Sequence, residues 1–189
     1  GMGLPKDHFD FVRSNTKEET DFPALAITDH GHMNSYAHAY TYTKELNKAG
    51  NKFKFIPGCE LYVHPDLKQW QKFKTEKELS TDVSEDTEHG STVENEDETK
   101  TTKHYDPIKR RHHLVVLPKN GKSLEKLFSI VSRGYLEGFY KFPRVDYNML
   151  REHKGSFIAS TACIGGPIAY DIFSAFTAAT FDDLKPSII

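Results

Sequence analysis

Four short apolar runs constrain the fold of this chain most, because each has the length of a β-strand and lies beside a side chain that can bind a metal ion. The runs are residues 24–27, 53–56, 114–117 and 157–159. The neighbouring side chains are, in the same order, those of His30, Glu60, His113 and Cys163. Ligands in α/β folds gather at strand ends. The pattern therefore predicts one site that draws its side chains from several strands.

Apolar spacing and punctuating residues predict the elements around these runs. We expect helices over Pro5 to Asn15, Met33 to Ala49, Ser123 to Leu136, Asp146 to Glu152 and Pro167 to Phe176. We expect strands over Ala24 to Thr28, Lys52 to Pro57, Glu60 to Val63, His112 to Leu117 and Ser156 to Ser160, with Gly58 separating the second strand from the third. Alternating strands and helices indicate an α/β fold with a parallel sheet and right-handed crossovers.

The segment between His64 and Arg111 lacks this alternation. Residues 76–103 are rich in Glu, Asp, Ser and Thr and hold almost no large apolar side chains. Such a stretch cannot bury enough surface to offset the entropy lost on ordering, so we expect a disordered acidic insertion. Two interpretations stay open, a solvated insertion without chemistry and a regulatory or partner-binding segment.

Composition excludes several classes of protein. The formal net charge of −2 is too small to indicate a nucleic-acid or membrane surface by itself. No apolar run is long enough for a transmembrane helix, and the N-terminus has no secretory-signal pattern, so we expect a soluble cytoplasmic protein without a membrane partner. Two cysteines are too few for a disulfide framework and leave thiols that can pack or bind metal.

Imidazole, carboxylate and thiolate form a ligand set for Zn²⁺ and similar ions. Because the chain has no C-x-x-C pair, the spacing favours a phosphoesterase site over a structural zinc knuckle. Each histidine taken alone could instead be a surface residue, and Cys163 a small buried apolar residue. Glu60 is the stronger candidate, since a carboxylate beside a buried strand is costly unless it is paired or binds a cation.

Two further residues are predicted to support the site. Asp29 lies next to His30, and metal-bound imidazoles usually donate their second N–H to a carboxylate, so Asp29 is a candidate orienting residue. Of His30 and His32, which flank Gly31, we expect only one to face the site. The segment Phe139 to Arg144 mixes aromatic and basic residues. It could meet phosphate through its basic side chains or form an aromatic plug with solvated basic tips.

These motifs together resemble a known family, the PHP (polymerase and histidinol phosphatase) domain of the bacterial replicative DNA polymerase III alpha subunit. The resemblance runs in order from about Gly3 to Ala169. The segments that carry it are Pro23 to Met33, Phe55 to Val63, His113 to Leu117, Tyr135 to Tyr140, Pro143 to Asp146 and Ser160 to Gly166.

The resemblance implies a distorted (β/α)7 barrel of the TIM-like kind whose strand ends hold divalent metal ions, Zn²⁺ or Mn²⁺. In metal-binding members it implies a 3′ to 5′ exonuclease that proofreads the polymerase, with DNA and other polymerase domains as partners. Four positions match family ligands, and Asp29 and Arg144 become catalytic candidates, Arg144 as the weaker, phosphate-contacting one. The matching ligand positions are His30, Glu60, His113 and Cys163.

The sequence also departs from the family pattern. The opening His-x-His motif and the closing Asp-x-His motif have no counterparts, and no polymerase palm is present. We therefore expect residues 1–189 to form a single incomplete PHP domain, a fragment without the first strand and the last part of the barrel. Such a fragment should bind metal weakly, have little or no activity, and self-associate through exposed strand edges. The alternatives are a non-catalytic structural or interaction module of the polymerase and, last, a histidinol-phosphatase-like small-molecule phosphatase.

Overall fold

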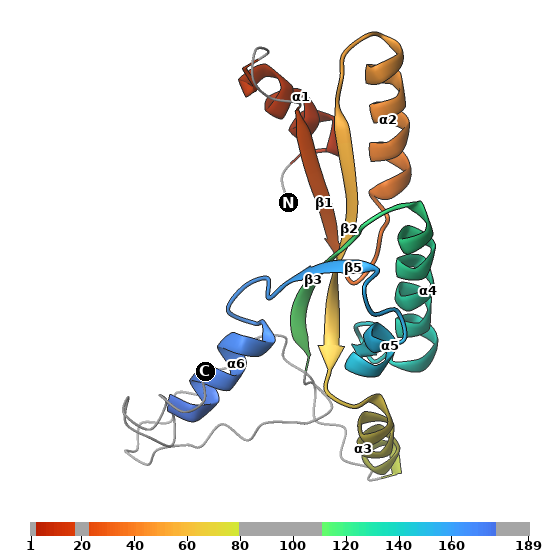
Figure 1. The fold of residues 1–189 in the computed structure, drawn as a ribbon. Coiled ribbons are helices and arrows are strands. Elements are labelled where there is room, and N and C mark those ends of the chain that lie inside the picture. The colour runs from red at the N-terminus through yellow and green to blue at the C-terminus, as the bar shows by residue number, and fades with distance from the viewer. Residues whose placement is uncertain (1–2, 18–22, 80–110, 177–189) are drawn as a thin grey trace. The chain divides into compact units, whose positions relative to one another are not determined.

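The computed structural model describes residues 3–17, 23–79 and 111–176, and Figure 1 shows them as a coloured ribbon. The chain divides into two units, residues 1–67 with 111–189 and residues 68–110. The first unit contains a mixed α/β arrangement around a five-stranded sheet. The described part of the second unit is the helix α3 (Leu67–Leu79), whose first residue belongs to the first unit.

Helix α3 was not predicted. Its sequence LKQWQKFKTEKEL is rich in residues with high helix propensity, namely Leu, Lys, Gln and Glu. The helix has no clear apolar stripe, so apolar spacing does not predict it. The helix also covers the first four residues of the stretch 76–103 that we expected to be disordered. Residues 80–103 of that stretch lie outside the described part of the chain.

The sheet is mixed. Its strands are β1 (Ala24–His30), β2 (Lys54–His64), β3 (His112–Pro118), β4 (Val145–Asp146) and β5 (Phe157–Ser160). Their order is β1-β2-β3-β5, with β4 beside β2. Strands β1 and β4 run parallel to β2, whereas β3 runs antiparallel to both β2 and β5.

The expectation of a parallel sheet is therefore wrong for β3. Val63 near the end of β2 pairs with His112 at the start of β3, so β3 begins at the same end of the sheet where β2 finishes. A parallel pair needs a crossover that returns the chain to the opposite edge. The barrel implied by the resemblance stays a prediction, because the strand path among the described residues is open.

Strand β2 is continuous through Gly58, where we expected a break between two strands. A Cβ atom at this position would strike the side chain of Leu117 and lie 2.8 Å from Cγ2 of Thr28, its register partner on β1. Glycine is thus required by close packing across the sheet rather than by a turn. The unbroken strand carries Glu60 on the same rigid element as residues 54–57.

The remaining helices agree with the predicted segments to within a few residues. They are α1 (Pro5–Asn15), α2 (Tyr36–Lys48), α4 (Gly121–Glu137), α5 (Tyr147–Arg151) and α6 (Pro167–Phe176). Side-chain caps explain two starts, since Asn120 accepts a hydrogen bond from the Ser123 N–H and Asp146 accepts one from the Met149 N–H. Helices α2 and α4 lie on the same side of the sheet in Figure 1. The rings of Tyr36 and Phe128 contact each other edge to face.

The apolar core anchors the strands that carry the candidate site. Phe9 of α1 is fully buried and stacks on Phe53, just before β2, with ring centroids 4.6 Å apart. Burial of each such side chain contributes about 1.5–3 kcal/mol. Further along the sheet Val63, Val116 and Ile130 are buried between β2, β3 and α4. None of the helices in the described ranges is both long and apolar enough to cross a bilayer.

Candidate metal centre

The structure brings three of the four predicted metal donors into one group and places the fourth, His30, beside Glu60. Nδ1 of His113 lies 2.9 Å from Oε1 of Glu60, and Nδ1 of His30 lies 3.3 Å from the same oxygen. Sγ of Cys163 lies 3.4 Å from Nδ1 of His113. Donor atoms of Glu60, His113 and Cys163 all lie within 4.8 Å of one another. Side chains up to 133 positions apart in the sequence thus share one location.

Strand register explains how three of these side chains meet. His30 at the end of β1 pairs directly with Glu60 of β2, and His113 of β3 pairs with Tyr62 of β2. Alternate residues of a strand share a face, so Glu60 and Tyr62 point to the same side of the sheet. Because β3 is antiparallel to β2, its first residues lie near the level of the end of β1, on the other side of β2. Convergence therefore depends on the mixed topology that the sequence did not reveal.

Cys163 reaches the cluster through the loop that follows β5. The backbone N–H of His113 donates to the carbonyl oxygen of Gly165 at 2.9 Å, which fastens the loop to the start of β3. Ala162 adopts φ of 57°, a left-handed conformation that disfavours residues with a Cβ. The Gly165 N–H also approaches Sγ of Cys163 at 3.4 Å. The loop thus holds the exposed thiol against His113 by a strained turn.

Glu60 has a buried carboxylate oxygen that a bound cation would stabilise. Its Oε1 is buried and accepts no hydrogen bond from any described residue, although two imidazole nitrogens lie within ion-pair distance. The short distances therefore record proximity, not hydrogen bonds of acceptable angle. Buried carboxylate oxygens without a partner are costly. Burial lowers the pKa of His113, against an opposing effect of the Glu60 charge, and so favours the neutral imidazole that binds metal.

The spacing of the donors fits a divalent ion. Neighbouring nitrogen, oxygen and sulfur donors on a tetrahedral Zn²⁺ lie roughly 3.3–3.6 Å apart, as the usual bond lengths require. The pairs His30–Glu60 at 3.3 Å and Cys163–His113 at 3.4 Å already have this spacing. The pair His113–Glu60 at 2.9 Å would open by roughly 0.4 Å. Glu60, His113 and Cys163 thus suit one ion, and borderline-soft Zn²⁺ fits them through its affinity for thiolate and imidazole. His30 borders this group through Glu60.

Comparison with known proteins identifies the family. The PHP domain matches residues 15–187 of the chain. The chain belongs to the PHP domain family. Curated relatives are DNA polymerase III alpha subunits. That of Chlamydia muridarum is 32% identical over 80% of this chain and 9% of its own length, and that of Deinococcus radiodurans is 32% identical over 89% and 10%. The alpha subunit of Helicobacter pylori strain J99 is 32% identical over 82% and 10%. The chain thus spans about a tenth of the length of these relatives.

Asp29 of this PHP domain makes its described contacts away from His30. Its carboxylate accepts hydrogen bonds from the backbone N–H and the hydroxyl of Ser35, at 2.8 and 2.9 Å, just before α2. His32 approaches the same carboxylate at 3.6 Å. Of the two histidines around Gly31, His30 thus lies beside Glu60 and His32 beside Asp29. The orienting role of Asp29 toward His30 stays a prediction.

Arg144 is occupied by the backbone of its own loop. Its side chain is buried, and Nη1 donates to the carbonyl oxygens of Tyr140 and Phe142 at 2.7 and 3.0 Å. Lys141 between them adopts φ of 58°. The guanidinium therefore holds a tight turn in place, which indicates a structural contribution. Its predicted contact with phosphate is not tested by these distances and stays a prediction.

The second cysteine of the PHP domain is not part of the cluster. The thiol of Cys59 is buried and donates to the carbonyl oxygens of Asp29 and His32 at 3.5 and 3.2 Å. Burial, reinforced by the charge of Asp29, raises the pKa of Cys59 to about 12. Cys59 therefore stays a protonated thiol at neutral pH and ties β2 to the turn after β1.

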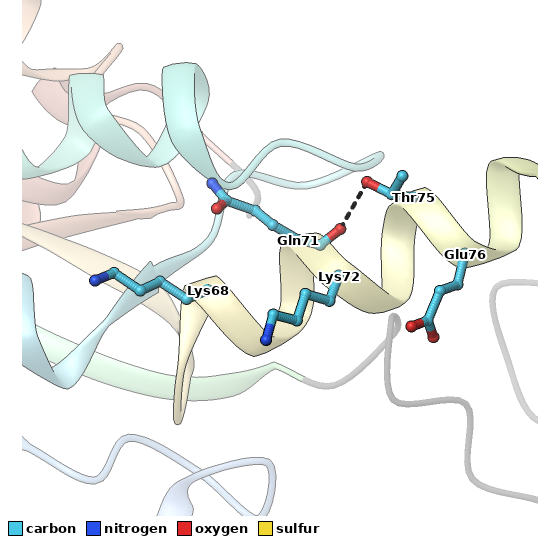
Figure 2. Close-up of a pocket in the computed structure, with 5 residues that line it drawn as sticks. All are labelled: Lys68, Gln71, Lys72, Thr75 and Glu76. Atoms are coloured by element: carbon cyan, nitrogen blue, oxygen red, sulfur yellow. Dashed lines mark hydrogen bonds between the residues drawn. The ribbon is translucent and has the colours of Figure 1, made fainter.

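A shallow hollow on α3 is chemically unrelated to the cluster. Figure 2 shows its lining side chains, all from one helix, with the hydroxyl of Thr75 donating to the carbonyl oxygen of Gln71 at 3.0 Å. The others are those of Lys68, Lys72 and Glu76. None of them is a donor of the candidate metal centre, and no His or Cys lines the hollow.

Two residues next to the donors were missed from the sequence. The ring of Tyr62 lies 5.2 Å from that of His113, and the guanidinium of Arg111 lies over the ring of Phe142 at 4.2 Å. A signal was available, since Tyr62 and Arg111 each lie two positions from a donor and so tend to share its side of an extended chain. The sequence alone gave no reason to choose Arg111 among its basic neighbours.

Proposed function

We propose that this PHP domain is a metal-binding module of a replicative DNA polymerase III alpha-type protein and that its ancestral reaction is hydrolysis of a phosphodiester at a DNA 3′ end. His30, Glu60, His113 and Cys163 would hold the ion, Zn²⁺ or Mn²⁺. The observation that carries the proposal is the meeting of Glu60, His113 and Cys163, with His30 beside them, at a buried Glu60 oxygen without a hydrogen bond.

The residues of the site have separable tasks in such a reaction. A bound divalent ion supplies Lewis-acid polarisation of a phosphoryl oxygen and lowers the pKa of a water. Glu60 and the neutral imidazole of His113 fix the position of the charge, and the loop of Cys163 closes one side. The described residues offer donors for at most one ion, whereas the resemblance implies several, so we expect partial occupancy and weak or absent hydrolysis. The expected cytoplasmic location and the self-association through strand edges belong to the same proposal.

A second candidate function is a non-catalytic module that contacts other polymerase domains. It is favoured by exposed apolar residues at the end of α4, where Leu136 is 84% exposed and the rings of Tyr135 and Phe139 stack 5.8 Å apart. The relatives are about ten times longer than the matched segment, so another domain of the same chain could cover this apolar surface. This candidate predicts no stoichiometric metal.

Elemental analysis and a nuclease assay distinguish the two functions. Purified protein should contain up to one equivalent of Zn²⁺ or Mn²⁺, which His113→Ala loses and His38→Ala, at an exposed position of α2, retains. A single-turnover assay on a single-stranded oligonucleotide should show little mononucleotide release. Robust metal-dependent release that disappears in His30→Ala would overturn the expected inactivity. Protein that binds no added metal would overturn the site and leave the non-catalytic module.

A further inference from the structure

Arg111 is a cation beside the candidate metal centre that no described acidic side chain neutralises. It directly precedes β3, and its guanidinium carbon lies 4.2 Å from the ring centroid of Phe142 and 5.6 Å from that of Tyr62. Its Nε is buried and finds no hydrogen-bond partner within the described ranges. The two aromatic rings, themselves 5.4 Å apart, therefore provide its packing but no acceptor.

Tyr62 connects this arginine to the metal donors. Its ring lies 5.2 Å from the ring of His113, with which it pairs across β2 and β3, and two positions from Glu60. The charge of Arg111 affects the pKa of both His113 and Tyr62. It helps burial to lower the pKa of His113, and it opposes the rise that burial causes in the pKa of Tyr62. The guanidinium and the donor cluster thus belong to one electrostatic environment.

A stacked guanidinium is suited to bind an oxyanion. Contact with aromatic rings uses the faces of the planar group and leaves its in-plane N–H donors for other partners. These donors match two oxygens of a phosphate in a bidentate arrangement. A purely structural cation–π contact explains the stacking but leaves the buried Nε–H without an acceptor.

We propose that Arg111 binds a phosphate oxygen of the substrate next to the metal donors. The identity of that substrate as a nucleotide rests on the proposed function, whereas phosphate binding by Arg111 can be tested without it. The family resemblance offered Arg144 as a weaker phosphate candidate, but Nη1 of Arg144 donates to backbone carbonyl oxygens. Arg111 would therefore supply the recognition of phosphate that the acidic and neutral donors of the cluster cannot.

Thymidine 5′-monophosphate is a suitable probe, with thymidine as the phosphate-free comparison. Calorimetric titrations of the full chain, with and without Zn²⁺, would compare wild type with Arg111→Gln and Arg111→Lys. Arg151→Gln is the matched control, because Arg151 is exposed and its guanidinium carbon also lies over a tyrosine ring, 5.9 Å from the centroid of Tyr147. We expect Arg111→Gln to bind the monophosphate roughly ten-fold or more weakly, as loss of a charge-assisted hydrogen bond implies. Arg111→Lys should recover part of that loss and Arg151→Gln should match wild type.

Outcomes of this titration separate the two proposals. Thymidine should bind wild type and Arg111→Gln equally weakly, and melting curves should show that all three variants fold. If wild type binds no metal but Arg111→Gln still weakens monophosphate binding, the proposed metal function fails and the role of Arg111 stands. Equal affinity of wild type and Arg111→Gln for the monophosphate would overturn the inference, as would the absence of saturable binding to wild type with or without Zn²⁺. If Arg111→Gln does not fold, Arg111→Lys becomes the test, and an affinity for the monophosphate equal to that of wild type would then count against the role of Arg111.

Discussion

Replacing Glu60 by glutamine should have opposite effects on stability with and without metal. Without metal, Oε1 of Glu60 is buried with no hydrogen bond from the described residues, and a buried unsatisfied acceptor costs about 1–3 kcal/mol. The amide of Glu60→Gln removes the charge and offers an N–H donor to the neighbouring Nδ1 of His113. We therefore expect the metal-free variant to gain about 1 kcal/mol in free energy of unfolding, the lower end of that range. For a chain of this size the melting temperature should rise by roughly 2–4 °C.

With Zn²⁺ the order should reverse. A ligand that binds only the folded state stabilises it by about 2.7 kcal/mol when its free concentration is a hundred times its dissociation constant. Wild type should then melt roughly 5–10 °C higher than in chelator. Glu60→Gln lacks the anionic oxygen that lies between His113 and His30, so its melting temperature should change little on addition of zinc.

Differential scanning calorimetry in chelator and at a fixed free zinc concentration measures both effects. Glu125→Gln, at an exposed position of α4, is the control for the loss of one negative charge and should behave as wild type in both conditions. The reasoning is refuted if Glu60→Gln melts below wild type in chelator, because Glu60 would then be well satisfied without a cation. A zinc-induced shift equal to that of wild type would refute its role as a ligand.

Three further perturbations test other parts of the structure. The exposed thiol of Cys163 should react quickly with a thiol reagent at pH 8 and be protected by Zn²⁺. Buried Cys59, whose pKa is raised to about 12, should stay unlabelled until the protein unfolds. Mass spectrometry of labelled peptides measures both reactions, and fast labelling of Cys59 would contradict this expectation. Ala162→Gly should relieve a left-handed backbone at φ of 57° and raise the free energy of unfolding by about 1 kcal/mol in urea titrations, and a decrease would argue against strain there. Gly58→Ala should cost about 1–3 kcal/mol in the same assay because its Cβ meets side chains of both neighbouring strands, whereas Gly121→Ala, with no atom within 4 Å, should cost nothing.

Local structure was largely predictable because it depends on neighbouring residues. Helices α1, α4 and α6 follow from apolar spacing and terminal Pro, Asn or Gly residues. Helix α3 and the continuity of β2 were not, for two different reasons. The helix expresses intrinsic preference without an amphipathic stripe, and Gly58 serves contacts with β1 and β3 that no sequence window contains. The direction of β3 depends on its pairing with β2, which is also non-local.

The four candidate donors could be predicted from the sequence because metal-capable side chains beside apolar runs are a local pattern. Whether they meet was a question of register. His30 lies opposite Glu60, and His113 lies within reach of both only because β3 is antiparallel. The two arginines also differ in their tertiary contacts, since Arg144 is buried against carbonyl oxygens and Arg111 is stacked on aromatic rings.

The sequence by itself determined the family, the helices and the chemical type of the donors, since these are written in residue identity and short-range spacing. Only the tertiary structure decided which candidate donor atoms lie within 4.8 Å of one another and which arginine lies near them. The physical reason is that strand pairing converts separations of many tens of residues into contacts of a few ångströms. A slip of one residue in that pairing would turn every side chain of the slipped strand to the other face of the sheet.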